Sequence, residues 1–320
     1  MTQLCEPAVD DLRERLRDHR ARVDAALRDA LVLAGDVPAQ LVEAMRYSLL
    51  APGKRLRPLL VILAAEACGA TLEQALPAGC AVEMVHTYSL IHDDLPAMDN
   101  DDLRRGLPTC HKQFGEALAI LTGDALLTLA FQVLSESYPP ATAAVACLEL
   151  ARGGGAAGMV GGQVEDLAWE RRLVRRDPNG TDEAPEPKLA DLENIHARKT
   201  GALFRACLRL GYWAACGEDR GRGDDSRLRC LDEYGRCFGQ LFQITDDLLD
   251  VEGTAEQTGK RVQKDAARGK LTYPGLLGAA ESRRRGAALA EAAARSAAAG
   301  LGPAGERLVA LIQLIQDRDR

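Results

Sequence analysis

The chain has 320 residues, of which 47% are hydrophobic but only 4% aromatic, and its formal net charge is −7. An acidic chain has no general electrostatic attraction for nucleic acid or for an anionic membrane surface, so neither is expected as a partner. The length allows one large domain or two smaller ones. The apolar residues are mainly alanine and leucine, which favour helices over strands.

Cysteine usage and the N-terminal sequence bear on the compartment. The nine cysteines are odd in number and form no C-x-x-C pair, so neither a zinc site nor a disulfide framework is indicated. The first residues, MTQLCEPAVDD, lack a signal-peptide profile, and no apolar run approaches the ~18 residues that span a bilayer. We therefore expect a soluble protein of the reducing cytoplasm, without membrane insertion.

Helical periodicity dominates the chain. Residues 9–31 repeat apolar positions at steps of three and four between charged residues. More uniformly apolar stretches, typical of helices buried on most sides, cover residues 57–70, 80–92 and 115–134. Gly123 and Asp124 interrupt the last stretch. A glycine and a charged residue are unusual inside a buried helix, so we expect a structural or functional role for them. No alternating β-branched run is long enough to indicate a sheet, so the sequence predicts an all-α protein.

Three other segments are a proline-rich stretch, an alanine-rich stretch and a glycine-rich stretch. Residues 175–188, RRDPNGTDEAPEPK, are typical of a solvated loop, because apolar helices are predicted on both sides. The alanine-rich stretch 279–300 is predicted to be helical or partly mobile. Residues 153–158, GGGAAG, formally match a dinucleotide-binding fingerprint, but that motif requires a preceding strand. An alanine-rich helix is predicted there instead, so the small residues indicate close helix packing.

A first aspartate cluster closes an apolar segment. Its members within ten residues are Asp93, Asp94, Asp99, Asp101 and Asp102. Asp93 and Asp99 are six residues apart, which would separate them by about 120° on a regular helix. Pro96 lies between them and clashes with the carbonyl of His92 in a continuous helix. We therefore expect the helix to break or bulge here, bringing Asp99 back toward Asp93.

A second cluster, in LFQITDDLLDVEG, also ends an apolar segment. Asp246 and Asp250 are four residues apart and therefore share one helix face, about one turn from each other, with Asp247 beside them. Hard oxygen ligands without His or Cys favour Mg²⁺, which takes one or two carboxylates and completes its shell with water and phosphate. One such cluster could be a solvated helix end, but two indicate a metal site.

Basic residues accompany the clusters. Isolated basic side chains are usually solvated, but beside a metal site they suit a polyphosphate, which guanidinium forks and ammonium groups can hold. The candidates are Lys54, Arg55, Arg57, Arg104, Arg105, Lys199, Lys260 and Lys270.

These residues are the ones by which the chain resembles the trans-isoprenyl diphosphate synthases, from about residue 40 onward. The two aspartate motifs carry the resemblance, and further matches follow in family order at 53–58, 104–106, 162–163, 199–200, 242–243 and 259–260. The resemblance implies one all-α domain over residues 1–320, with its motifs within about 40–280. The implied architecture is a large helical bundle around a central cavity, the isoprenoid synthase fold, usually as a homodimer.

The resemblance also implies roles for individual residues. Mg²⁺, about three ions per site, would be held by Asp93, Asp94, Asp99, Asp246, Asp247 and Asp250. The allylic diphosphate would be bound by Arg104, Lys199 and Lys260, with Lys270 as a further candidate. Isopentenyl diphosphate would be bound, without metal, by Lys54, Arg57, His86 and Arg105. Oxygen atoms of Thr200 and Gln243 would face the developing carbocation.

The implied reaction joins isopentenyl diphosphate to dimethylallyl or geranyl diphosphate, giving farnesyl diphosphate and free diphosphate. Tyr88 occupies the position at which an aromatic ring limits product length in bacterial farnesyl diphosphate synthases. The helical wheel instead places Ser89 nearest to Asp93, about 40° away, whereas Tyr88 lies about 140° away. A geranylgeranyl product is the alternative. A terpene cyclase or a catalytically silent subunit of a heteromeric synthase fits less well, because both aspartate motifs and the bases are present.

Overall fold

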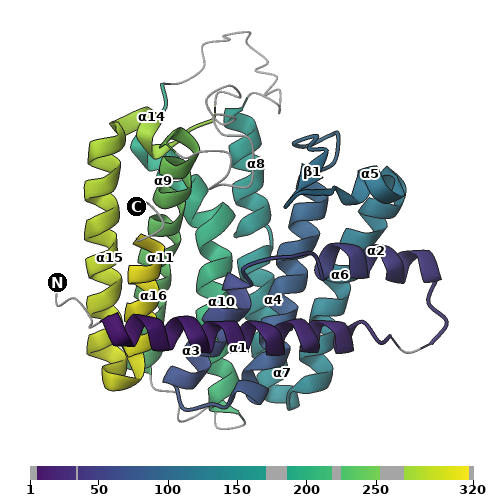
Figure 1. Ribbon diagram of the computed structural model, residues 1–320, viewed down its shortest axis with the longest axis horizontal. Helices are drawn as coiled ribbons and strands as arrows, with labels where there is room; N and C mark the ends of the chain where they lie inside the picture. The colour runs from purple at the N-terminus through teal and green to yellow at the C-terminus, as the bar shows by residue number, and fades with distance from the viewer. Residues whose placement is uncertain (1–5, 34, 171–185, 218–224, 253–269, 317–320) are drawn as a thin grey trace. The chain divides into compact units, whose positions relative to one another are not determined.

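The computed structural model describes residues 6–33, 35–170, 186–217, 225–252 and 270–316. Nearly all of them are helical (Figure 1), which confirms the prediction of an all-α protein. The backbone divides into two compact units: residues 10–150 with 207–225, and residues 1–9 with 151–206 and 226–320. We call them the first-motif unit and the second-motif unit, because each holds one aspartate cluster. That they form a single domain around a central cavity stays a prediction.

The first-motif unit is built around a helix that is buried on most sides. Its helices are α1 (Glu6–Ala30), α2 (Ala39–Leu49), α3 (Leu56–Ala67), α4 (Leu72–Asp93), α5 (Cys110–Phe114), α6 (Glu116–Ser137), α7 (Pro140–Gly154) and α10 (Ala202–Cys216). Three of them, α1, α7 and α10, have some residues that belong to the other unit. Helix α4 packs along α6 and against α3. It begins at a capping box, in which Thr71 and Gln74 exchange hydrogen bonds between side chain and backbone. Its far end presents Asp93.

The glycine that interrupts α6 makes room for a side chain of α4. A Cβ atom at Gly123 would lie 2.2 Å from Nε2 of His92. That nitrogen lies 3.1 Å from the carbonyl oxygen of Ile120, to which it can donate. The neighbouring Asp124 is exposed and lies 3.9 Å from His92. Gly123 therefore allows α4 and α6 to approach closely, next to the first aspartate cluster.

The second-motif unit is also helical. Beyond its share of α1, α7 and α10, it contains α8 (Met159–Trp169), α9 (Leu189–His196), the π-helix η1 (Ala197–Gly201), α11 (Asp225–Glu252), α14 (Tyr273–Leu277), α15 (Ala279–Leu301), the 3-10 helix η3 (Gly302–Gly305) and α16 (Glu306–Gln316). One core cluster joins Leu192, Ile244, Leu248 and Tyr273. The alanine-rich stretch is an ordered helix, since Ala290, Ala293 and Ala297 of α15 are fully buried.

The GGGAAG stretch is preceded by a helix, as predicted, and its first two glycines form the end of that helix. Residues Pro140–Gly154 form α7, and a Cβ atom at Gly153 would lie 2.5 Å from the Cβ of Ala206. The glycine therefore serves close packing, and a dinucleotide fingerprint after a strand is excluded. Most of the predicted loop 175–188 lies outside the described residues.

Two helical stretches have the length and composition of membrane spans, which differs from the prediction. They are Glu116–Ser137 and Pro140–Trp169, with mean hydropathy of 1.8 and 1.2. Their most apolar windows are 39% and 44% buried, and α6 packs along α4. Core helices of soluble proteins meet the same criterion, so length and composition alone do not indicate a membrane-spanning segment.

Glu66 of α3 ties α1 to α3 and predicts a pH-dependent stability. Its carboxylate lies 2.9 Å from Arg15 Nη2 and 3.1 Å from His19 Nε2. Burial alone would raise the pKa of Glu66, but the hydrogen bonds from His19 and Arg15 outweigh it and lower that pKa to about 2. Because the folded pKa is depressed, the stabilisation is complete above the unfolded pKa, near 4.5, and is lost as the pH falls toward 2.

We expect Glu66→Gln to lower the free energy of unfolding by roughly 2 kcal/mol at pH 6, and by progressively less below pH 4.5. Urea unfolding of both proteins at pH 6 and at pH 3.5 measures this difference. An equal difference at both pH values would contradict the assignment. Arg13→Gln, which removes an exposed pair with Asp10 on the same helix, is the control.

Candidate active site

The chain turns back immediately after α4, as predicted. The backbone N–H of Asp99 donates to the carbonyl oxygen of Asp93 at 2.8 Å, and that of Asn100 donates to Leu95 at 3.1 Å. Asn100 has a positive φ of 51°, which closes the turn. The side chains of Asp93 and Asp99 are both half-buried. The break at Pro96 therefore brings the two outer aspartates of the first motif together.

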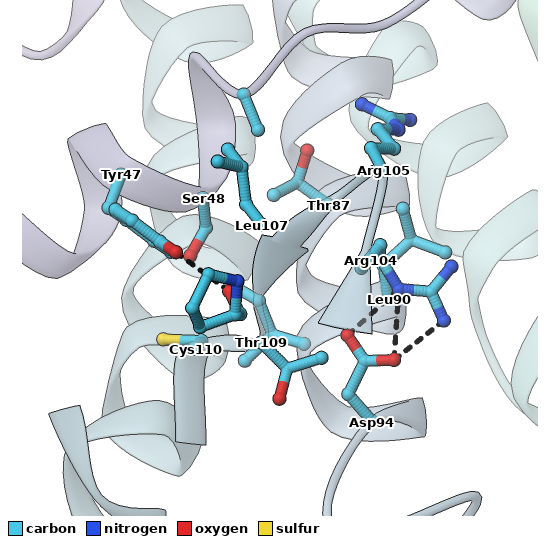
Figure 2. Close-up of a pocket in the computed structure, with 13 residues that line it drawn as sticks. Tyr47, Ser48, Thr87, Leu90, Asp94, Arg104, Arg105, Leu107, Thr109 and Cys110 are labelled. Atoms are coloured by element: carbon cyan, nitrogen blue, oxygen red, sulfur yellow. Dashed lines mark hydrogen bonds and ion pairs between the residues drawn. The ribbon is translucent and has the colours of Figure 1, made fainter. Parts of the chain in front are cut away.

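Asp94 points inward and is engaged by an arginine (Figure 2). It is 3% exposed, and Arg104 donates to it through Nε at 2.8–2.9 Å and through Nη2 at 2.6 Å. Burial raises the pKa of Asp94, and the Arg104 guanidinium only partly offsets this effect. Asp94 therefore holds Arg104 in place, whereas Asp93 and Asp99 are the more accessible carboxylates.

Arg104 is carried by a short β-hairpin that the sequence did not reveal. Strand β1 (Leu103–Arg104) pairs antiparallel with β2 (Leu107–Pro108). The turn residues Arg105 and Gly106 have φ values of 54° and 79°, as a type I′ turn requires. The Tyr47 hydroxyl donates to the Pro108 carbonyl at 2.7 Å and ties the hairpin to α2. A cavity of about 50 Å³ lies between α2, α4 and the hairpin (Figure 2).

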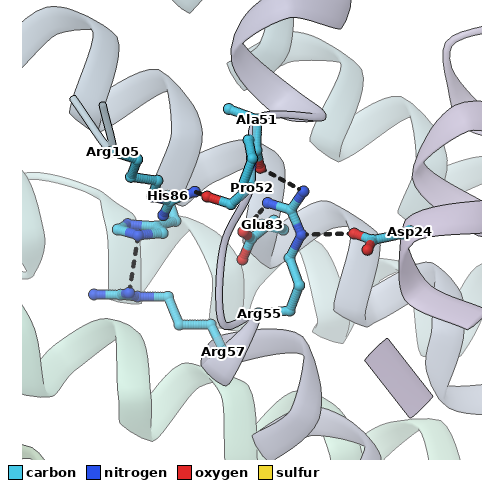
Figure 3. A network of polar contacts seen from close by, with 8 residues as sticks. All are labelled: Asp24, Ala51, Pro52, Arg55, Arg57, Glu83, His86 and Arg105. Carbon is cyan, nitrogen blue, oxygen red and sulfur yellow. Dashed lines mark hydrogen bonds and ion pairs between the residues drawn. The ribbon is translucent and has the colours of Figure 1, made fainter. Parts of the chain in front are cut away.

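All four residues predicted to bind isopentenyl diphosphate lie in the first-motif unit, and Figure 3 shows Arg57, His86 and Arg105. Nη1 of Arg57 donates to Nε2 of His86 at 3.0 Å, since arginine cannot accept a hydrogen bond. Burial, reinforced by Arg57 and Arg105, holds the pKa of His86 well below its usual range. The imidazole is therefore neutral and orients Arg57. Lys54 lies on the adjoining loop with its side chain exposed.

The second aspartate cluster lies on α11 and presents two different faces. Asp246 is exposed and Asp250 half-buried, on the shared helix face that their spacing predicted. Asp247 is 2% exposed and accepts hydrogen bonds from Gln243 Nε2 and from the backbone N–H of Tyr273, both at 2.9 Å. Burial raises the pKa of Asp247 to about 7, although these hydrogen bonds oppose the shift. Asp246 and Asp250 are thus the accessible pair.

Lys199 and Thr200 lie on the π-helix η1, an element often found at functional sites. Thr200 Oγ1 donates to Gln243 Oε1 at 3.1 Å, and Lys199 Nζ contacts Asp166 of α8. A Cβ atom at Gly162 would lie 2.2 Å from the backbone nitrogen of Lys199. This explains the glycine of the Gly-Gln pair, because α8 must approach η1 closely.

Asp166 contacts the predicted ligand Lys199 and so joins the candidate site, although it was not predicted from the sequence. It is 4% exposed. Burial would raise the pKa of Asp166, but Lys199 and Lys270 outweigh it, so that pKa is lowered. Its position one helical turn after the Gly162-Gln163 pair was the available signal. The predicted ligand Lys260 lies outside the described residues.

The accessible carboxylates have the chemistry that Mg²⁺ requires. Within the described parts of the chain, no group of three or more His, Cys, Asp or Glu side chains is arranged to hold a metal. Mg²⁺ needs only one or two protein carboxylates when water and phosphate complete its shell. The pairs Asp93 with Asp99 and Asp246 with Asp250 fit that need. Asp94 and Asp247 are held inside their own units.

An all-α fold with two aspartate-rich helix ends, each beside basic residues, defines the class of the trans-prenyltransferases. The polyprenyl synthetase profile matches residues 38–300, which is most of the sequence. The chain belongs to the polyprenyl synthetase family.

Individual relatives extend this result. A dimethylallyltranstransferase of Fischerella ambigua is 44% identical over 310 residues, covering 96% of this chain and 83% of the relative. A farnesyl diphosphate synthase of Geobacillus stearothermophilus is 46% identical, with 81% and 82% covered. The crystal structure of an FPP/GFPP synthase from Zymomonas mobilis has a TM-score of 0.81 at 36% identity, covering 96% of this chain and 99% of that one. These matches confirm the isoprenoid synthase fold.

Proposed function

We propose that this protein joins isopentenyl diphosphate to dimethylallyl or geranyl diphosphate, forming farnesyl diphosphate and releasing diphosphate. The proposal rests on one observation: each aspartate motif contains two accessible carboxylates and one buried carboxylate. Asp93, Asp99, Asp246 and Asp250 remain accessible, whereas Asp94 and Asp247 orient other residues. The relatives named for dimethylallyl transfer and for farnesyl diphosphate synthesis support this reading.

An allylic diphosphate ionises only when its departing anion is stabilised. Mg²⁺ bound at the accessible carboxylates would supply Lewis-acid stabilisation of the leaving group. Arg104 and Lys199 supply fixed positive charge, and each is already oriented by a buried carboxylate, Asp94 or Asp166. Charged groups held in place before the reaction need little reorganisation as negative charge develops.

A hydrogen-bonded chain orients the oxygen atoms expected to face the carbocation. Asp247 accepts from Gln243, whose amide oxygen in turn accepts from Thr200. The Thr200 hydroxyl proton is thereby directed to Gln243. A lone pair of the Thr200 hydroxyl oxygen is then left to face the cation. A closed apolar cavity would keep water away from the cation until the alkene attacks. The released diphosphate is the nearest base for the final proton.

Incubation of the purified protein with isopentenyl diphosphate, geranyl diphosphate and Mg²⁺ tests the proposal. We expect release of diphosphate and formation of a longer prenyl diphosphate by the protein alone. No turnover without a second, different chain would favour the silent-subunit alternative. Cyclic hydrocarbons from geranyl or farnesyl diphosphate alone would favour a terpene cyclase.

Product length rests on Tyr88. Its side chain is 7% exposed, and its ring lies edge-to-face with that of His92, with centroids 5.7 Å apart. If this ring blocks the path of the growing chain, Tyr88→Ala should shift the main product from the fifteen-carbon farnesyl to the twenty-carbon geranylgeranyl chain. Chromatography of dephosphorylated products measures the shift, with Tyr88→Phe as the control that keeps the ring. An unchanged product in an active Tyr88→Ala variant would exclude Tyr88 as the limit.

A geranylgeranyl product is the second candidate, because chloroplastic geranylgeranyl pyrophosphate synthases of Arabidopsis thaliana are also similar, one at 49% identity over 250 residues. A twenty-carbon main product from the unmodified protein would select it.

We also infer a homodimer in the cytoplasm. The apolar side chains of Ile120 and Leu121 on α6 are 44% and 57% exposed, which supports pairing with a second copy. Sedimentation at micromolar concentration tests the dimer. The described cysteines are all unbridged, as expected in a reducing compartment.

A further inference from the structure

Arg55 is buried in the first-motif unit and makes three contacts that leave it facing away from Arg57 (Figure 3). It is 4% exposed. Its guanidinium donates to Asp24 of α1 at 2.8 Å, to Glu83 of α4 at 2.9 Å and to the carbonyl oxygen of Ala51 at 2.9 Å. One side chain therefore links two helices to the loop that precedes α3.

The backbone gives no local reason for an arginine at this position. Arg55 has φ 50° and ψ 34°, a left-handed conformation that side chains with a Cβ atom adopt at a cost. It is also the N-cap residue of α3, where its side chain caps no backbone N–H. Asparagine or glycine would suit the conformation better. The three guanidinium contacts are therefore what arginine contributes here.

A second left-handed arginine holds the neighbouring carbonyl of the same loop. Arg105, with φ 54°, donates from Nη1 to the carbonyl oxygen of Pro52 at 3.0 Å. A Cβ atom at Gly53 would lie 2.5 Å from that same Nη1, so a larger residue there would force the Arg105 guanidinium to shift. The consecutive carbonyls of Ala51 and Pro52 are thus each bound by a guanidinium, which fixes the loop 51–54.

The contacts of this loop set the positions of the diphosphate-binding side chains on either side of Arg55. Glu83 and His86 lie three residues apart on α4, on adjacent turns of one face. Glu83 holds Arg55, and His86 holds Arg57. Lys54 immediately precedes Arg55, so its backbone is set by the same anchor.

We propose that Arg55 is a positioning residue for isopentenyl diphosphate, which acts through Glu83, Asp24 and the Ala51 carbonyl without touching the substrate. Anchoring the loop 51–54 holds Lys54, Arg57 and Arg105 in place before the diphosphate arrives. The inference rests on the proposed function, since it assigns those three residues to isopentenyl diphosphate.

The variant Arg55→Lys tests this positioning role. Lysine keeps the positive charge but lacks the planar guanidinium that reaches three acceptors at once. We expect the KM for isopentenyl diphosphate to rise about tenfold, while the KM for geranyl diphosphate and kcat change less than about twofold. Calorimetric titration with isopentenyl diphosphate alone, which does not turn over, should show the same loss of affinity. Glu83→Gln, an isosteric change, should act in the same direction but more weakly.

Arg209→Lys is the matched control. Arg209 donates to Glu149 at 2.7 and 3.0 Å in the same unit, and the two side chains are 21% and 6% exposed. Arg209→Lys should lower Tm about as much as Arg55→Lys does, without changing the KM for isopentenyl diphosphate or for geranyl diphosphate. Equal rises in both KM values for Arg55→Lys, or none in a folded variant, would overturn the proposal.

If Arg55→Lys does not fold, Glu83→Gln and Asp24→Asn decide by the same criterion. An unmodified protein that turns over no isopentenyl diphosphate would instead overturn the proposed function, and this inference with it. A protein that turns over substrate normally in every variant would overturn this inference alone.

Discussion

Asp93→Asn and Asp246→Asn are each expected to lower kcat by at least about two orders of magnitude. Each change removes a carboxylate oxygen from an accessible pair, the first on the turn after α4 and the second on α11. The fold should persist, because Asp93 is only half-buried, Asp246 is exposed, and each removal relieves repulsion between neighbouring carboxylates. Initial rates at saturating substrate, with circular dichroism as a check on the fold, measure the effect.

Asp102→Asn is the control for this prediction. Asp102 belongs to the same acidic stretch but is exposed and paired with Lys112 at 2.8 Å, so its loss should hardly change kcat. A chelator should abolish activity, and excess Mg²⁺ should restore it. Mg²⁺ with diphosphate should also raise the Tm of the unmodified protein more than that of either variant. Full activity in the chelator would contradict the metal assignment.

Arg57→Ala and Arg104→Ala are expected to affect different substrates. Arg57→Ala should raise the KM for isopentenyl diphosphate by about thirtyfold and that for the allylic substrate much less, because a charge-assisted contact to one diphosphate is lost. Arg104→Ala should show the opposite bias. Steady-state kinetics with each substrate varied in turn measures both. Equal effects on the two substrates from both variants would mean that the diphosphate sites are misassigned.

For Arg104→Ala, an effect on stability must be distinguished from an effect on substrate binding. Removing Arg104 leaves Asp94 buried without its cation, which typically costs about 3 kcal/mol. The double variant Arg104→Ala with Asp94→Asn removes that buried charge and should recover most of the lost Tm. Its KM bias should match that of Arg104→Ala alone. Recovery of the KM as well would show that the arginine acts through stability.

Spacing within one helix was the most reliable guide to the site. The four-residue step from Asp246 to Asp250 predicted a shared face, and the structure confirms it, since an α-helix converts sequence separation directly into angle. The proline between Asp93 and Asp99 predicted the return of the chain, because a missing N–H and a steric clash are local effects. Gly123 was recognised as anomalous, but its partner His92 was not.

Contacts between distant segments were beyond the sequence reasoning. The Asp94–Arg104 pair depends on a hairpin with two residues per strand, which is too short for any alternating pattern. The buried role of Arg55 depends on Glu83 and Asp24, which lie 28 and 31 residues away. Similarly, nothing in the separation of the two aspartate motifs gives a distance across space. Their union in one metal site therefore stays a prediction.

The π-helix η1 has a consequence for how this protein tolerates changes in chain length. A π-helical turn holds an additional residue relative to an α-helix, in which each residue advances by about 100°. Deleting one residue from Ala197–Gly201 would convert the π turn into a regular α turn, so α10 should stay close to its present phase and Phe204 should keep its ring contacts with Phe238 and Phe242. A one-residue deletion here should therefore change how Lys199 and Thr200 are presented and leave the packing of α10 largely intact. A one-residue gap in an alignment with a relative that has a regular helix here should be placed within Ala197–Gly201.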